Sequence, residues 1–96
     1  MSRNERRAIR KAGGLDATSF LKVADKFIDL ANKENQTVKA HELHMAFLFA
    51  AARYNAYVAK AVQRVENHEE FVEHMAKEYT DMLRQHLADP SIDPQD

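Results

Sequence analysis

Apolar residues recur at helical spacing in a first segment, residues 18–34. They lie three or four positions apart, at Phe20, Val23, Phe27 and Leu30, with Ala24, Ile28 and Ala31 widening the stripe. This period predicts an amphipathic α-helix and excludes the alternation of a β-strand. Asp16, Thr18 and Ser19 are candidate N-cap residues, because a side-chain oxygen there can accept from a free N–H of the first turn.

A segment after Asn67 has the same period. Its stripe is formed by Val72, Met75, Tyr79, Met82 and His86. Asn67 followed by Glu70 resembles a capping box, and Asp89-Pro90 is expected to end this helix. Between the first and second helices lies a polar run, residues 32–36, after which Thr37 is expected to cap the second helix.

The middle segment, residues 38–65, is apolar around most of its circumference. It contains eight alanines and four aromatic residues, with no glycine or proline. At about 100° per residue its charged side chains fall into one narrow strip, formed by Glu42, Arg53, Lys60 and Arg64. A helix of this kind must be covered on most of its surface, and a chain of 96 residues has little else to cover it with.

The apolar surface of this middle helix resolves into two seams. The bulky seam is expected to face the chain's own helices and contains His44, Phe47, Ala51, Tyr54, Val58, Ala61 and Val65. The alanine seam is expected to face a second copy of the chain, with the interface residues Met45, Leu48, Ala52, Asn55, Ala56, Ala59 and Val62. Small side chains there let another helix approach closely. Asn55 either fixes the register of that contact, as one asparagine does in coiled coils, or is hydrogen-bonded within its own chain.

These elements predict an all-α fold. We expect an antiparallel three-helix unit with a long central helix, completed by homodimerisation. Residues 1–14 are expected to be a flexible basic arm that ends at Gly13-Gly14, and residues 15–88 to be the three-helix domain. Residues 89–96 are expected to be an acidic disordered tail.

The composition limits the chemistry that the protein can perform. The absence of cysteine excludes disulfides, thiolate metal sites and cysteine nucleophiles. Neither a Gly-rich phosphate loop nor a nucleophile elbow is present, so we expect no catalytic residue, no cofactor and no enzymatic activity. The start of the chain lacks the apolar region of a secretory signal, and charges interrupt the middle helix. A cytoplasmic protein without membrane contact is therefore expected.

Two stretches, residues 24–32 and 52–58, resemble a bacterial family of short, uncharacterised helical proteins that is known only as a domain of unknown function. They read ADKFIDLAN and ARYNAYV. The resemblance extends to Glu78-Tyr79 and Met82-Leu83, so it covers most of residues 18–88. It implies a helical bacterial protein, and it implies no activity, ligand or catalytic residue.

Histidines supply one alternative chemistry. His41 and His44 are three residues apart and share a helix face, and antiparallel packing would place them near His86 and Asp29. These four side chains are suitable ligands for Zn²⁺ or Ni²⁺, but HELH lacks the four-residue histidine spacing of zinc proteases. Since His86 also fits as a hydrogen-bonded histidine of the core, we expect no metal.

The charges are unevenly spread along the chain. Residues 1–14 carry five bases and one acid, whereas residues 89–96 carry three acids and no base. The basic side chains could bind the phosphates of a nucleic acid or of lipid headgroups, and they are Arg3, Arg6, Arg7, Arg10 and Lys11. The arm has no aromatic residue to stack on bases, and short charged runs are usually solvated. We therefore expect a non-enzymatic assembly or interaction module that forms a homo-oligomer, with a dimer favoured. Two alternatives are kept: a nucleic-acid-binding protein that uses the basic arm, and a metal-binding protein or metal-dependent enzyme at the end of the bundle that carries His41, His44 and His86.

Overall fold

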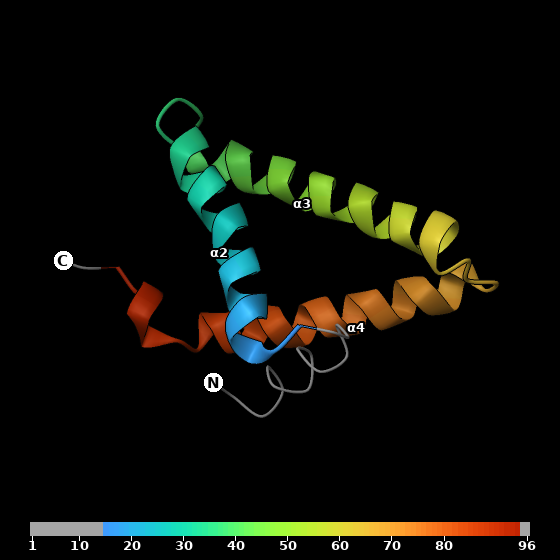
Figure 1. Cartoon of the computed structure of the whole chain (residues 1–96). Helices are drawn as coiled ribbons and strands as arrows, with labels where there is room; N and C mark the ends of the chain where they lie inside the picture. The colour runs from blue at the N-terminus through green and yellow to red at the C-terminus, as the bar shows by residue number, and fades with distance from the viewer. Residues whose placement is uncertain (1–14, 95–96) are drawn as a thin grey trace.

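The computed structural model describes residues 15–94, and its regular structure there is all helical (Figure 1). Within this range lie three α-helices, α2 (Ala17–Glu34), α3 (Ala40–Tyr57) and α4 (His68–Leu87). A π-helical segment, η1 (Val58–Val62), continues α3, and a 3₁₀ turn, η2 (Pro90–Ile92), follows α4. The predicted all-α class with three main helices is confirmed.

The three helices form an open arrangement in place of a closed bundle. From the turn at residues 63–67, α3 and α4 diverge, and α2 runs off at a steep angle from the start of α3 (Figure 1). The molecule measures 48 × 30 × 22 Å, and its radius of gyration is 14.9 Å. A compact domain of this length has a radius of gyration of about 12.5 Å. The helices are therefore less closely packed than those of a self-contained domain.

The described part of the chain has almost no core. Ala59, at 4% exposure, is its one buried hydrophobic residue, and no polar residue is buried. The accessible surface of the chain is 8543 Å², whereas a compact monomer of its mass exposes about 5,600 Å². Large apolar side chains remain exposed on all three helices.

Helix α2 begins where the sequence predicts. Asp16 is its N-cap, and the Oδ1 atom of Asp16 accepts a hydrogen bond of 2.7 Å from the backbone N–H of Ser19. This contact satisfies one of the free N–H groups of the first turn. The helix ends at Glu34, as the polar run 32–36 indicates.

The start of the second helix differs from the prediction. Helix α3 begins at Ala40, and its N-cap Lys39 makes no side-chain cap hydrogen bond. Thr37 does not cap it. The backbone N–H groups of Thr37 and Val38 donate to the carbonyl oxygen of Glu34, because the connection first satisfies the free carbonyl groups at the end of α2.

The long central helix changes its winding near its end. The N–H of Gln63 donates to the carbonyl oxygen of Val58 at 2.8 Å, which is the i→i−5 pattern of a π-helix. The chain then turns at Arg64, whose φ of 52° is left-handed. The N–H of Val65 closes this turn on the carbonyl oxygen of Ala59 at 2.9 Å.

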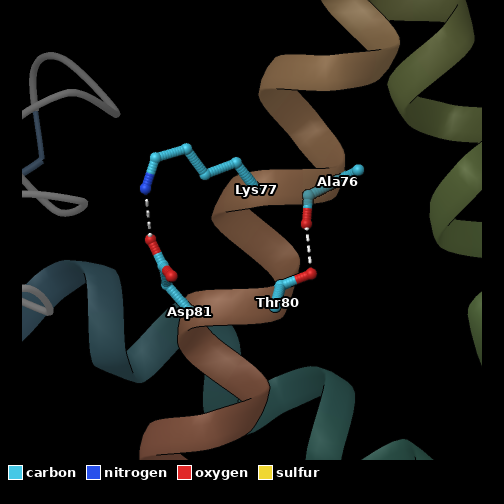
Figure 2. Close-up of polar contacts among 4 residues, drawn as sticks. All are labelled: Ala76, Lys77, Thr80 and Asp81. Carbon is cyan, nitrogen blue, oxygen red and sulfur yellow. Dashed lines mark hydrogen bonds and ion pairs between the residues drawn. The ribbon is translucent and has the colours of Figure 1, made fainter.

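Helix α4 has the predicted cap and local surface contacts. The Oδ1 atom of Asn67 accepts from the N–H of Glu70 at 3.1 Å. In Figure 2, Lys77 pairs with Asp81 at 3.1 Å, and the hydroxyl of Thr80 donates to the carbonyl oxygen of Ala76 at 2.7 Å. Both contacts join residues four positions apart, so they support α4 itself and do not hold it to another helix.

The sequence after α4 also has local order within the described residues. The Oδ1 atom of Asp89 accepts from the N–H of Ser91 at 2.9 Å, and Pro90 begins the single turn η2. The predicted basic arm, residues 1–14, lies outside the described residues. The division into arm, domain and tail therefore stays a prediction.

The left-handed backbone at Arg64 predicts the effect of glycine there. A residue with a Cβ pays about 1–2 kcal/mol in this conformation, and glycine does not. We expect Arg64→Gly to raise the free energy of unfolding by up to about 1 kcal/mol, measured by urea denaturation. Gln63→Gly is the matched control, because Gln63 is right-handed helical and glycine should lower stability there by about 0.5–1 kcal/mol. A destabilised Arg64→Gly variant would contradict the turn geometry.

The cap of α2 predicts a dependence of stability on pH. The hydrogen bond from the backbone N–H of Ser19 lowers the pKa of Asp16 below its ordinary value of 3.8. A carboxylate with a lowered folded pKa stabilises the fold above its unfolded pKa, and this stabilisation is lost as pH falls through the folded value. In thermal unfolding followed by circular dichroism, Asp16→Ala should be less stable than the unmodified protein at pH 7, and the difference should shrink below pH 3.8. Asp16→Asn keeps a cap that does not titrate, so a similar acid-dependent loss in that variant would contradict the assignment.

Candidate functional site

An apolar groove lies between α3–η1 on one side and α4 on the other. Its volume is about 570 Å³. It is open because α3 and α4 diverge from their connecting turn (Figure 1). We treat this groove as the candidate functional site, since a concave apolar surface of this size on a small chain marks a place where another molecule can bind.

The α3 side of the groove is formed mainly by small residues. Its lining includes Leu48, Ala51, Ala52, Asn55, Ala56 and Ala59. These positions follow one another in steps of three and one, so they form two adjacent rows on one face of the helix. With only a Cβ on most of these positions, the surface presents shallow holes that another helix can approach closely.

Most of the predicted alanine seam lines this groove. Five of its seven residues do so, namely Leu48, Ala52, Asn55, Ala56 and Ala59. The other two, Met45 and Val62, are exposed and lie outside the lining. The period of the sequence thus identified a continuous surface, and whether a second copy covers it stays a prediction.

The α4 side of the groove is formed by larger residues. They are Phe71, Val72, Met75, Tyr79 and Met82, and four of them belong to the predicted apolar stripe of this helix. Phe71 was missed, although it lies four residues before Met75 and so shares that face. His86, the last residue of the predicted stripe, is exposed and is not part of the lining.

The bulky seam of α3 was expected to face the chain's own helices, but most of it does not line the groove with α4. Tyr54 is 65% exposed, and α4 lies across the groove from the alanine seam. Ala51 and Val65, the residues of the bulky seam that do line the groove, are among its smaller members. The turn at residues 63–67 therefore leaves the alanine seam of α3, and not its bulky seam, on the side of the groove that α4 lines.

The polar groups of the groove do not form a reactive constellation. Asn55 lies near its middle, and Lys60 and His68 lie at the end next to the turn. A nucleophile with a base, or a pair of carboxylates, would be needed for hydrolytic or acid–base chemistry, and neither lines this surface. What the arrangement can do is bind apolar surface, with Asn55 as one polar group that constrains the alignment.

The metal candidates are spread over different parts of the molecule. His41 and His44 lie in the first turns of α3, His86 lies near the end of α4, and Asp29 lies on α2. The start of α3 and the end of α4 are the ends at which the two helices are apart (Figure 1). Between residues 15 and 94, no three side chains of histidine, cysteine, aspartate or glutamate are grouped as a metal ion requires.

The anion-binding candidates all belong to the predicted basic arm. Arg3, Arg6, Arg7, Arg10 and Lys11 all lie outside the described residues. Of the helices that the structure describes, none combines the length and the apolar character that crossing a membrane requires.

A family model described as "Protein of unknown function (DUF3144)" matches residues 20–90. No curated protein and no solved structure matches the chain. The matched range includes nearly all of α2, the whole of α3, η1 and α4, and every residue that lines the groove. The resemblance to an uncharacterised family is thereby confirmed, and the chain belongs to the DUF3144 family of proteins of unknown function.

Proposed function

We propose that this protein is a non-enzymatic assembly module that forms a homodimer through the groove between α3 and α4. The observation that carries the proposal is the lack of a core in the single chain. Ala59 is the one buried hydrophobic residue of the described range, and a fold needs extensive apolar burial to offset the loss of conformational entropy. A second copy of the chain supplies the missing cover.

The amount of exposed surface supports a large interface. The chain exposes 8543 Å², more than the about 5,600 Å² of a compact monomer of the same mass. Within residues 15–94, large apolar side chains of α2, α3 and α4 contribute to this exposed surface. Obligate homodimers bury large apolar interfaces of this kind, and in such a dimer folding and association are coupled.

The kind of exposed side chain supports the same proposal. Phe49 on α3 is 74% exposed, and further large apolar residues are exposed on each helix, among them Phe27, Leu30, Tyr57, Val72 and Leu87. Aromatic residues and methionine are enriched in protein interfaces, and contiguous apolar surface marks interaction sites. No observation on residues 15–94 favours the alternatives of nucleic-acid binding or metal binding in a comparable way.

A glutamate in the groove tests the proposal. Ala52 is exposed in the single chain, so Ala52→Glu should cost a monomer little. If a second copy covers Ala52, the same substitution buries a carboxylate in an apolar interface and should weaken the dimer by about 3 kcal/mol or more. Light scattering at micromolar concentration should give twice the 11.0 kDa chain mass for the unmodified protein, and a monomer or an unfolded chain for Ala52→Glu.

Ala50→Glu is the matched control. Ala50 and Ala59 are nine residues apart, so at about 100° per residue they lie on opposite sides of the helix, and Ala50 does not line the groove. We expect Ala50→Glu to keep both the helical circular dichroism and the dimer mass. A folded monomeric unmodified protein, or equal effects of the two substitutions, would refute assembly through the groove.

A further inference from the structure

The apolar stripe of α2 has no cover of its own in the single chain. Val23, Phe27 and Leu30 are 40%, 57% and 55% exposed, and no residue of α2 lines the groove. Of the charged residues between Phe20 and Ala31, Lys22, Asp25 and Asp29 lie more than about 100° from the centre of the stripe, and Lys26 lies at its edge. Burying the stripe would therefore leave Lys22, Asp25 and Asp29 in water, with the long side chain of Lys26 at the rim.

The stripe and the groove match in spacing and in length. Val23, Phe27 and Leu30 are separated by four and three residues, and so are Ala52, Ala56 and Ala59. Each set spans about 10.5 Å at 1.5 Å per residue. Large side chains on one helix and small ones at the same period on the other are suited to knobs-into-holes packing. Phe71, Met75 and Tyr79 of α4 form the opposite wall against which such knobs would pack.

The chain's own α2 is tethered too closely to fill this groove. The connection to α3 is centred near Thr37, so in an antiparallel hairpin Phe27 would lie opposite position 47 and Val23 opposite position 51. Ala56 and Ala59 would then face positions 15–18, which are beyond the stripe. An α2 helix from a second copy has no such tether. It can therefore lie along the groove with Phe27, the middle residue of the stripe, next to Asn55 and Ala56.

We infer that α2 of a second copy occupies the groove, so that two chains exchange their α2 helices reciprocally. This inference rests on the proposed dimer and names the segment that forms it. The contact is isologous, because each chain places its α2 stripe in the other chain's groove. Both stripes and both grooves are then covered, so the assembly stops at two chains. Helix-in-groove docking by residues at i, i+4 and i+7 is a recurring mode of helix recognition.

Photo-crosslinking in a dimer of mixed isotopes tests the exchange. Phe27 is replaced by p-benzoyl-phenylalanine, equal amounts of ¹⁵N-labelled and unlabelled full-length chains are unfolded and refolded together, and crosslinked peptides are identified by mass spectrometry. If α2 is exchanged, about half of the crosslinks from position 27 to the peptides of α3 or α4 should join a labelled to an unlabelled peptide, by random pairing of equal populations of chains. The same replacement at Asp25, about 200° away on α2, is the control and should give no crosslink to Ala52, Ala56 or Ala59.

The outcomes separate this inference from the proposed dimer. Crosslinks from position 27 to the groove that are never mixed show that α2 folds back on its own chain, which overturns the exchange. A dimer mass without any crosslink to the groove also overturns the exchange and leaves the assembly standing. A monomer mass for the unmodified chain overturns both.

A substitution gives an independent measurement of the same contact. Phe27 is more than half exposed in the single chain, so Phe27→Ala should change the helicity of a monomer little. If the ring fills the partner's groove, Phe27→Ala should raise the dimer dissociation constant at least about 100-fold, measured by sedimentation equilibrium. Asp25→Ala, on the side of α2 away from the stripe, should leave that constant within about threefold. Equal effects of the two substitutions would contradict the exchange.

Discussion

The structure depends on the need to cover the apolar circumference of α3. A helix with eight alanines and four aromatic residues between positions 38 and 65 cannot be stable in water with one face packed and the rest exposed. The chain provides two further helices, and α4 meets α3 closely only near the turn at residues 63–67. The remaining surface of α3, together with the stripes of α2 and α4, is left without intrachain cover. This shortage of cover goes with the open shape of the single chain, and the proposed assembly rests on it.

Alanine has two opposing effects at this site. Its small side chain lets backbone approach closely, and Ala59, in the π-helical segment next to the turn, is the one buried hydrophobic residue within residues 15–94. An alanine side chain also removes little area from water, so a contact made by alanines alone contributes little hydrophobic stabilisation. The larger side chains have to come from elsewhere. On α4 they are Phe71, Met75 and Tyr79, and in the inferred exchange α2 of a second copy would add Phe27 and Leu30.

The sequence predicts the local structure better than the packing, for a physical reason. Helical period and capping chemistry act within a few residues, so α2 and its Asp16 cap, and the Asn67 cap of α4, follow from the sequence alone. Thr37 was misassigned because threonine can serve either helix terminus, and the end of α2 was nearer. The π-helical segment and the left-handed Arg64 carry no glycine or proline to mark them, so residue type gives no signal there.

One wall of the groove, the alanine seam of α3, was predictable from sequence, whereas its place opposite α4 was not, because α4 was expected to pack on the bulky seam. Leu48, Ala52, Asn55, Ala56 and Ala59 share one face of α3 by spacing alone, which is why the alanine seam was found. A helical period is the same whether the covering helix belongs to the same chain or to another. Two observations support a second copy as the source of the covering helix. The position of the connection between α2 and α3 follows from the sequence, whereas the exposure of Phe27 requires the three-dimensional structure.

If the hydrophobic core is completed only in a pair of chains, each chain folds only when it associates with another. A ligand that binds the folded state stabilises it by mass action, and for such a dimer the second chain is that ligand. The stability of the folded chain then rises with protein concentration. A substitution in the apolar stripe of α2 would destabilise the other chain of the pair, because the stripe lies in that chain's groove. Because the same groove is the main unfilled apolar surface of α3 and α4, any other amphipathic helix that binds there must compete with α2. Assembly and further recognition would therefore be alternative uses of one surface, and the concentration of the chain would decide between them.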